Sequence, residues 1–232
     1  SHFTCECTSF SKLLMMEESP LIKLFLIKVA ARCNINCTYC YEYNLADQSW
    51  KGKPSRMTEE TLCQTVSRMK EHVVEHKIKN ITVVFHGGEP LLAGKEFFKF
   101  AVNHINQELK ENCLPKFAMQ TNGLLIDETW IDLFKQLEIN VGLSIDGYKE
   151  LNDKFRLDFK GYSTFEGVEK ALKLMSTKEA ESVMGGTLCV MQHDTNPIEL
   201  FKWFINWGRT KVDFLFPHHN HPKQLRHQFY YF

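Results

Sequence analysis

The chain has 232 residues, of which 44% are hydrophobic, and its 28 lysines and arginines balance 28 aspartates and glutamates. This length supports one sizeable core, and the balanced charge, without a basic stripe, argues against nucleic acid as a partner. No apolar run approaches the ~20 residues that a membrane span needs, so we expect no membrane partner either.

Apolar, β-branched runs alternate with helical patterns along the chain, which predicts βα units and a mostly parallel sheet. The expected strands are residues 21–29, 81–85, 117–120, 140–144, 186–191 and 211–216. Helices are expected after Thr58, across 98–109, after Asp127, after a capping-box pattern at 163–166 and after Asn196. Six units are too few for an eight-unit barrel, so the predicted fold class is α/β, a partial (β/α)6 TIM-type barrel with mostly parallel strands.

The use of cysteine predicts a reducing compartment. Eight cysteines are too sparse for a disulfide scaffold in a chain of this length, and Cys33, Cys37 and Cys40 crowd into eight positions just after the first expected strand. Such crowding is typical of cysteines that hold metal in the cytoplasm. We therefore expect a cytoplasmic protein with a metal centre.

The cysteine loop, residues 33–40, offers three thiolates and no fourth. Three thiolates can each bind one iron of a cubane, which leaves the fourth iron for a ligand from outside the protein. Two alternatives stay open. The spacing also fits a helix face, although Asn34, Asn36 and Thr38 form helices weakly, and a zinc site would need a distant fourth ligand.

The segment CNINCTYC, residues 33–40, resembles the C-x3-C-x2-C signature of radical S-adenosylmethionine enzymes, including the aromatic Tyr39. The resemblance implies a [4Fe-4S] cluster on Cys33, Cys37 and Cys40, whose open iron binds the amino and carboxylate groups of S-adenosylmethionine, with Tyr39 beside the cofactor. The other cysteines are scattered and none lies beyond Cys189. We therefore expect one cluster.

Three further motifs that leave expected strands fit the same family: HGGEP (86–90), QTNG (120–123) and SIDG (144–147), the last followed by LNDKFR (151–156). The resemblance implies that Gly87, Gly88 and Glu89 hold the methionine amino group, that Ser144 and Arg156 contact the ribose and carboxylate, and that Gln120 and Asn122 line the substrate pocket. Taken alone, the glycine pair also fits a simple turn, and Arg156 also fits a solvated surface arginine.

The combination of motifs is similar to the branch that modifies peptides. The segment DFLFPHHNH, residues 213–221, resembles one in maturases that form cyclophane crosslinks, which implies that Pro217, His218 and His219 face the pocket. We therefore expect crosslinking of a ribosomally made peptide, driven by a flavodoxin or ferredoxin type electron donor. Formylglycine formation or another peptide oxidation is the alternative, and a non-catalytic metal-binding module is a third.

The resemblance covers residues 21 to about 216. We therefore expect an N-terminal segment at 1–20, a radical S-adenosylmethionine core at 21–216 and a C-terminal tail at 217–232, without an auxiliary-cluster domain.

Overall fold

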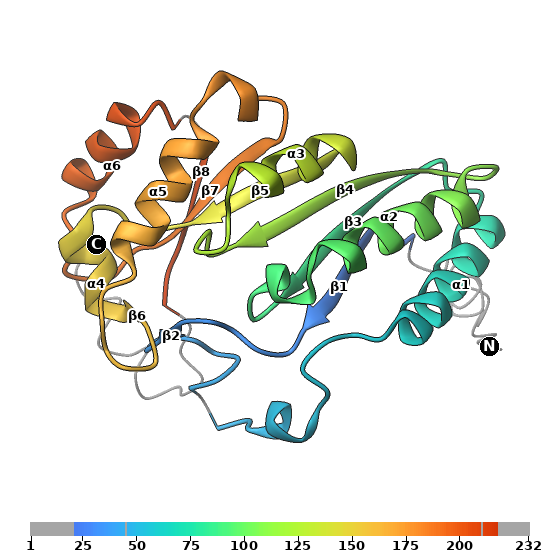
Figure 1. Cartoon of the computed structure of the whole chain (residues 1–232), viewed down its shortest axis with the longest axis horizontal. Coiled ribbons are helices and arrows are strands. Elements are labelled where there is room, and N and C mark those ends of the chain that lie inside the picture. The colour runs from blue at the N-terminus through green and yellow to red at the C-terminus, as the bar shows by residue number, and fades with distance from the viewer. Residues whose placement is uncertain (1–20, 45, 210, 218–232) are drawn as a thin grey trace, which may run out of the picture.

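Six strands form one sheet in which they lie side by side in chain order (Figure 1). The computed structural model describes residues 21–44, 46–209 and 211–217. The strands are β1 (Leu24–Ala30), β3 (Asn80–Gly87), β4 (Leu114–Thr121), β5 (Ile139–Ser144), β7 (Met184–Val190) and β8 (Val212–Leu215). Every neighbouring pair is parallel, which confirms the predicted partial (β/α)6 architecture.

The helices lie along the outside of this sheet (Figure 1). They are α1 (Glu59–Glu75), α2 (Lys95–Leu109), α3 (Glu128–Gln136), α4 (Lys149–Phe155), α5 (Phe165–Met175) and α6 (Pro197–Asn206), with three 3-10 helices, η1 (Ser49–Gly52), η2 (Pro90–Ala93) and η3 (Lys178–Ala180). The five helices that the sequence predicts are present. The structure adds α4, a helix of seven residues that the sequence pattern did not predict.

The core lies between the sheet and its helices. Ile81, Val83 and Phe85 of β3 are buried, and the ring of Phe85 meets that of Phe98 on α2 at 5.3 Å between centroids. Because side chains alternate along a strand, the intervening residues of β3, which include His86, lie on the other face of the sheet. Side chains of that face line a pocket, His86 and Gln120 among them.

Side-chain caps begin three of the predicted helices as expected. Thr58 accepts a hydrogen bond from the Thr61 amide, Asp127 accepts one from the Trp130 amide, and Asn196 accepts bonds from the first turn of α6. Each such cap stabilises a helix by about 1 kcal/mol.

The capping box predicted at Ser163 to Glu166 is wrong. Helix α5 begins at Phe165 with Thr164 as its N-cap, whose side chain makes no capping bond, and the Ser163 hydroxyl accepts from the Phe165 amide at 3.2 Å instead of from that of Glu166. The Thr164 hydroxyl instead donates to the carbonyl of Arg156 at 2.5 Å. This bond holds the backbone of Arg156.

A second, two-stranded sheet joins the cysteine loop to the segment after β5. Strand β2 (Asn36–Cys37) pairs antiparallel with β6 (Arg156–Leu157), so that Cys37 lies opposite Arg156. The Thr38 amide extends the pairing by donating to the carbonyl of Phe155 at 2.9 Å. Figure 1 shows the two short strands side by side, below the main sheet.

No helix within the described ranges is long and apolar enough to cross a membrane. The expected segment at 1–20 and residues 218–232 of the expected tail lie outside the described residues, and the proposed domain boundaries stay predictions.

Candidate functional site

A pocket of about 440 Å³ opens where the strands of the main sheet end and the cysteine loop begins. Its volume falls in the range of small-molecule and cofactor sites. Of the residues that the sequence singles out, those lining it are Cys33, Cys37, Tyr39, Cys40, Gly87, Gly88, Gln120, Asn122, Ser144, Arg156 and Pro217. Glu89 does not line it, and His218 and His219 lie outside the described residues.

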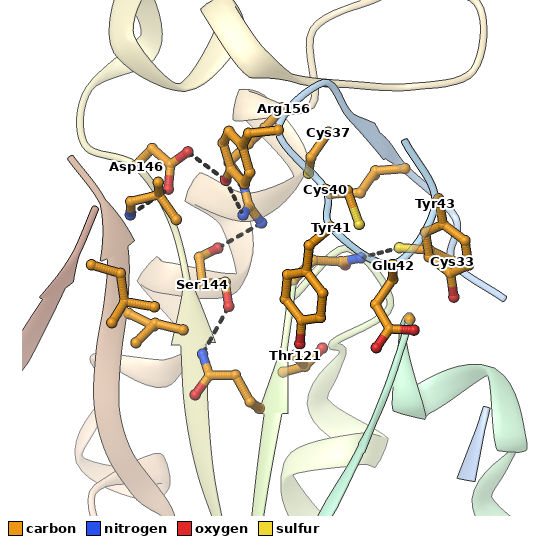
Figure 2. A pocket seen from close by; sticks show the side chains of 18 of the residues that line it. Cys33, Cys37, Cys40, Tyr41, Glu42, Tyr43, Thr121, Ser144, Asp146 and Arg156 are labelled. Carbon is orange, nitrogen blue, oxygen red and sulfur yellow. Dashed lines mark hydrogen bonds between the residues drawn. The ribbon is translucent and has the colours of Figure 1, made fainter. Parts of the chain in front are cut away.

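The three thiols of the cysteine loop lie together at one side of this pocket (Figure 2). Burial raises the pKa of all three, that of Cys33 to about 12. Since metals bind the thiolate, these thiols need a strongly positive ligand such as an iron centre to lose their protons. The Asn122 amide already points at one of them, donating to Cys33 Sγ at 3.7 Å.

The three thiols on one loop suit a cubane. A lone zinc ion needs its sulfur ligands at about 2.3 Å from one point, and among the described residues no three His, Cys, Asp or Glu side chains are placed to share one metal ion. A cubane places its irons at separate corners, so each thiolate on the loop can meet a different iron. The residues present therefore fit a [4Fe-4S] group.

A buried chain of polar groups links the cysteine loop to the end of β5 (Figure 2). The Tyr39 hydroxyl donates to Asp146 Oδ2 at 2.6 Å and accepts from Arg156 Nη1 at 3.2 Å. The other Asp146 oxygen accepts from the Val190 amide at 3.0 Å. Burial raises the pKa of Asp146, although Arg156 opposes the rise. The side chain of Asp146 thus holds the cysteine loop, β5 and β7 together.

Arg156 is 6% exposed, so it is not a solvated surface arginine. Its Nη2 donates to the Ser144 carbonyl at 3.0 Å, while Ser144 Oγ accepts from Gln120 Nε2 at 2.8 Å. Burial alone would lower the pKa of Arg156, but Tyr39 and Asp146 outweigh it and keep the pKa above its ordinary value.

The Nε of Arg156 has no hydrogen-bond partner in the described part of the chain. Buried donors without a partner are rare in native proteins, and a guanidinium pairs best with a carboxylate. Arg156 and Ser144 both line the pocket, so this side of it suits a ligand that carries a carboxylate, as the methionine end of S-adenosylmethionine does.

The two glycines of HGGEP lie where the backbone leaves no room for a side chain. A Cβ on Gly87 would collide with the carbonyl of Ala30, and Gly87 has a φ of 142°. A Cβ on Gly88 would collide with the Tyr43 hydroxyl and the Arg32 carbonyl. The pair therefore lets the start of the cysteine loop lie directly against the end of β3, and a cofactor contact for Gly87 and Gly88 stays a prediction.

Glu89 is 1% exposed, and its carboxylate forms hydrogen bonds beneath the pocket. One carboxylate oxygen accepts from the Leu91 amide at 3.0 Å and from the Thr121 hydroxyl at 2.7 Å. The other accepts from the Asn122 amide at 2.8 Å. Burial raises the pKa of Glu89, while these donors oppose the rise. A contact with the methionine amino group stays a prediction.

Several residues that line the pocket received no role from the sequence, among them Tyr43, His86 and Asp146. Asp146 and His86 lie inside the quoted motifs SIDG and HGGEP, so their place after a strand was a usable signal. Tyr43 carried no such signal, because its position depends on a ring contact with Trp50 at 4.9 Å.

Comparison with known proteins identifies the family. The profile of the Radical SAM superfamily matches residues 27–201. A cysteine-type anaerobic sulfatase-maturating enzyme of Clostridium perfringens strain 13 is 34% identical over 76% of this chain and 46% of its own length. A serine-type anaerobic sulfatase-maturating enzyme of Bacteroides thetaiotaomicron is 28% identical over 66% of this chain and 36% of its own.

Solved structures agree with this result. Native anSMEcpe with bound AdoMet and Cp18Cys peptide superposes with a TM-score of 0.72 at 31% identity, covering 85% of this chain and 51% of that one. Methylornithine synthase, at 16% identity and a TM-score of 0.55, shares the fold. The chain spans about half the length of the curated relatives that it matches. Because the family profile covers most of the chain, the protein belongs to the radical SAM superfamily of enzymes.

Proposed function

We propose that this protein oxidises a cysteine or serine side chain of a peptide, with S-adenosylmethionine as the source of the radical. The observation that carries the proposal is the 34% identity to a cysteine-type sulfatase-maturating enzyme over 76% of the chain. The similar structure with bound Cp18Cys peptide adds support, since it has a peptide substrate in a fold of this kind. The comparisons thus favour the alternative of side-chain oxidation over the crosslinking that residues 213–221 suggested.

In this proposal Cys33, Cys37 and Cys40 hold one [4Fe-4S] cluster. When bound, the cluster and S-adenosylmethionine supply a 5′-deoxyadenosyl radical that takes a hydrogen atom from an unreactive carbon. A flavodoxin or ferredoxin type protein in the cytoplasm delivers the electron. The loop keeps its shape because β2 and β6 pair through Cys37 and Arg156.

The residues around Arg156 bind and orient the cofactor in this proposal. The guanidinium of Arg156, which lines the pocket, receives the methionine carboxylate, and Ser144, already bonded to Gln120, presents its hydroxyl to the ribose. Tyr39 and Asp146 hold the guanidinium in place. Because these groups are buried, their contacts with an anion are stronger than the same contacts in water.

Peptide crosslinking is the second candidate. It is favoured by the pocket's own lining, because Leu215, Phe216 and Pro217 reach it from the end of β8, and this is the segment that resembles the crosslinking maturases. In this reading Asn122 and Pro217, together with His218 and His219, contact the peptide.

The test uses the full chain, reconstituted anaerobically with iron and sulfide and supplied with S-adenosylmethionine, dithionite and Cp18Cys peptide. We expect 5′-deoxyadenosine together with a peptide whose mass and fragments place an aldehyde at the former cysteine. Loss of two hydrogens shared between two residues would instead support crosslinking. A protein that holds its cluster and forms no 5′-deoxyadenosine would refute both.

A peptide with serine in place of the cysteine distinguishes the two substrate types. Its product is the same aldehyde, formed with loss of two hydrogens from one residue. The control is the Cys33→Ala, Cys37→Ala, Cys40→Ala protein, which should form neither product.

A further inference from the structure

We propose that residues 46–56, beside the start of the cysteine loop, form the docking surface for the protein that delivers the electron, and that this carrier presents an acidic face. The proposal rests on the proposed function, to which it adds the place where the carrier binds. It follows from how the segment is fixed to the cysteine loop and from the charges that it leaves exposed.

The segment is fixed to Arg32, the residue directly before Cys33. The Arg32 guanidinium donates to the carbonyls of Trp50 at 2.9 Å, Lys51 at 3.4 Å and Lys53 at 3.2 Å. It also lies over the Trp50 ring, 5.0 Å from the ring centroid. Figure 1 shows the segment as the light blue loop below β1. One arginine therefore holds this surface in a defined position beside the first proposed cluster ligand.

The fixed segment presents positive charge to solvent. Its exposed cations are Lys51, Lys53 and Arg56. Within the described ranges none of the three forms an ion pair. Asp47 is the acidic residue of the segment, and Glu59 and Glu60 follow in the first turn of α1, where the helix dipole offsets their charge. The surface therefore attracts a partner with an acidic face.

This surface lies outside the pocket but close to the cysteines. None of its three cations lines the pocket, so a carrier bound there leaves the pocket to the peptide. Trp50 packs edge to face against Tyr43, with 4.9 Å between the ring centroids, and Tyr43 lines the pocket together with Cys33 and Cys40. A carrier seated around Trp50 thus approaches the proposed cluster without entering the space of the substrate.

The step that this surface serves is the transfer of one electron without a proton. A fully reduced flavodoxin loses one electron, and the [4Fe-4S] group on Cys33, Cys37 and Cys40 gains it. The two centres need to come close, and no bond forms between the proteins. A transient complex steered by charge meets this need, because attraction between opposite charges raises the association rate and salt screens it.

The first experiment measures binding of a fluorescently labelled, acidic flavodoxin by anisotropy, using the full chain reconstituted with its cluster. The variant Lys51→Gln, Lys53→Gln, Arg56→Gln should bind about tenfold more weakly at low salt, the low end of what charge steering contributes. Raising sodium chloride from about 50 to 500 mM should weaken binding by the wild type far more than binding by this variant.

The second experiment changes the reductant to separate docking from the enzyme's own chemistry. With reduced flavodoxin, the triple variant should reduce its cluster about tenfold more slowly than the wild type does, read by freeze-quench electron paramagnetic resonance. With dithionite, a small reductant that needs no docking surface, the two proteins should form 5′-deoxyadenosine equally fast. A segment needed only to hold the cysteine loop would instead lower both rates.

The matched control removes three exposed lysines elsewhere on the chain, as Lys110→Gln, Lys116→Gln, Lys170→Gln. Among the described residues these lysines also form no ion pair. The control changes the net charge by the same amount as the triple variant does. It should bind flavodoxin and accept its electron as the wild type does.

Three results would overturn the docking surface: wild-type binding and reduction by flavodoxin in the triple variant, an equal loss in the control, or loss of dithionite-driven 5′-deoxyadenosine in the triple variant. None of them touches the proposed function, whose test uses the wild type with dithionite and reads the peptide product. Conversely, a wild type that takes electrons from flavodoxin through this surface and forms 5′-deoxyadenosine without aldehyde would refute the peptide oxidation and support the docking surface.

Discussion

Arg156 donates a hydrogen bond to the hydroxyl of Tyr39 at 3.2 Å, across 117 positions of sequence. Tyr39 belongs to the cysteine loop, and Arg156 follows α4 at the far end of the pocket. The same hydroxyl donates to Asp146 at 2.6 Å, so one phenol oxygen joins a buried carboxyl and a buried guanidinium. Several groups that surround the proposed cofactor therefore depend on a single oxygen atom.

Tyr39→Phe should lower the free energy of unfolding of the apoprotein by roughly 1–3 kcal/mol, because it leaves a buried carboxyl oxygen and a buried N–H group without a partner. Urea unfolding measures the change. Tyr162→Phe is the matched control, since Tyr162 is 67% exposed, and it should be neutral. Equal losses in the two variants would contradict a structural role for the Tyr39 hydroxyl.

Glu89→Gln should also destabilise the apoprotein by roughly 1–3 kcal/mol. The carboxylate accepts bonds from Leu91, Thr121 and Asn122, and the NH2 group of a glutamine would face one of these donors. Glu96→Gln removes a glutamate whose side chain is 85% exposed and should change the midpoint of denaturation little. An unaltered midpoint in Glu89→Gln would show that the three bonds contribute nothing.

Gly88→Ala should destabilise the protein by roughly 1–3 kcal/mol, the usual cost of overpacking. The added methyl group would meet both the Tyr43 hydroxyl and the Arg32 carbonyl. Gly52→Ala adds the same methyl group where no atom lies within 4 Å. Thermal unfolding measures the melting temperatures of the two variants, and their difference reports the effect of the collision at residue 88. Similar melting temperatures would argue against the collision.

Changing Cys33, Cys37 and Cys40 together to Ala should abolish iron uptake, since all three proposed ligands are lost. Iron and sulfide analysis after anaerobic reconstitution measures this directly. Cys63→Ala on α1, away from the pocket lining, should keep the wild-type content of about four irons per chain. A wild-type content near eight irons would show that one cluster is too few.

Stability should depend on pH through His86. Burial lowers the pKa of His86 in the folded protein, so the unfolded chain takes up a proton at a higher pH than the folded protein does. As the pH falls through about 6.5, the wild type should therefore lose stability relative to His86→Gln. Urea unfolding of both proteins between about pH 7.5 and pH 5 measures this difference, and parallel curves would contradict the lowered pKa.

Local patterns in the sequence predicted the main sheet and most of its helices. Strand alternation and caps such as Thr58, Asp127 and Asn196 act within a few residues, so a single sequence carries them in full. Because all six strands are parallel, their ends had to gather at one edge. The meeting of the cysteine loop with Ser144 at the end of β5 was therefore predictable.

Features that depend on distant partners were not predictable in this way. Strands β2 and β6 have two residues each, too few for any alternation, and exist only because they pair with each other. The hydroxyl of Thr164 donates to the carbonyl of Arg156, a bond that no local pattern indicates. Likewise, no residue near Glu89 in the sequence indicates that Thr121 and Asn122 donate hydrogen bonds to its carboxylate.

The pairing of β2 with β6 sets an order of events during synthesis. When the three thiols leave the ribosome, the chain that will hold their loop has not been made, since Tyr39 and Arg156 are 117 residues apart. At 5–20 residues per second this interval lasts roughly 6–23 s. For that time the thiols are unprotected, and exposed thiols are open to oxidation. Synthesis of this protein therefore needs reducing conditions until residue 156 has been added to each chain, quite apart from what the finished enzyme tolerates.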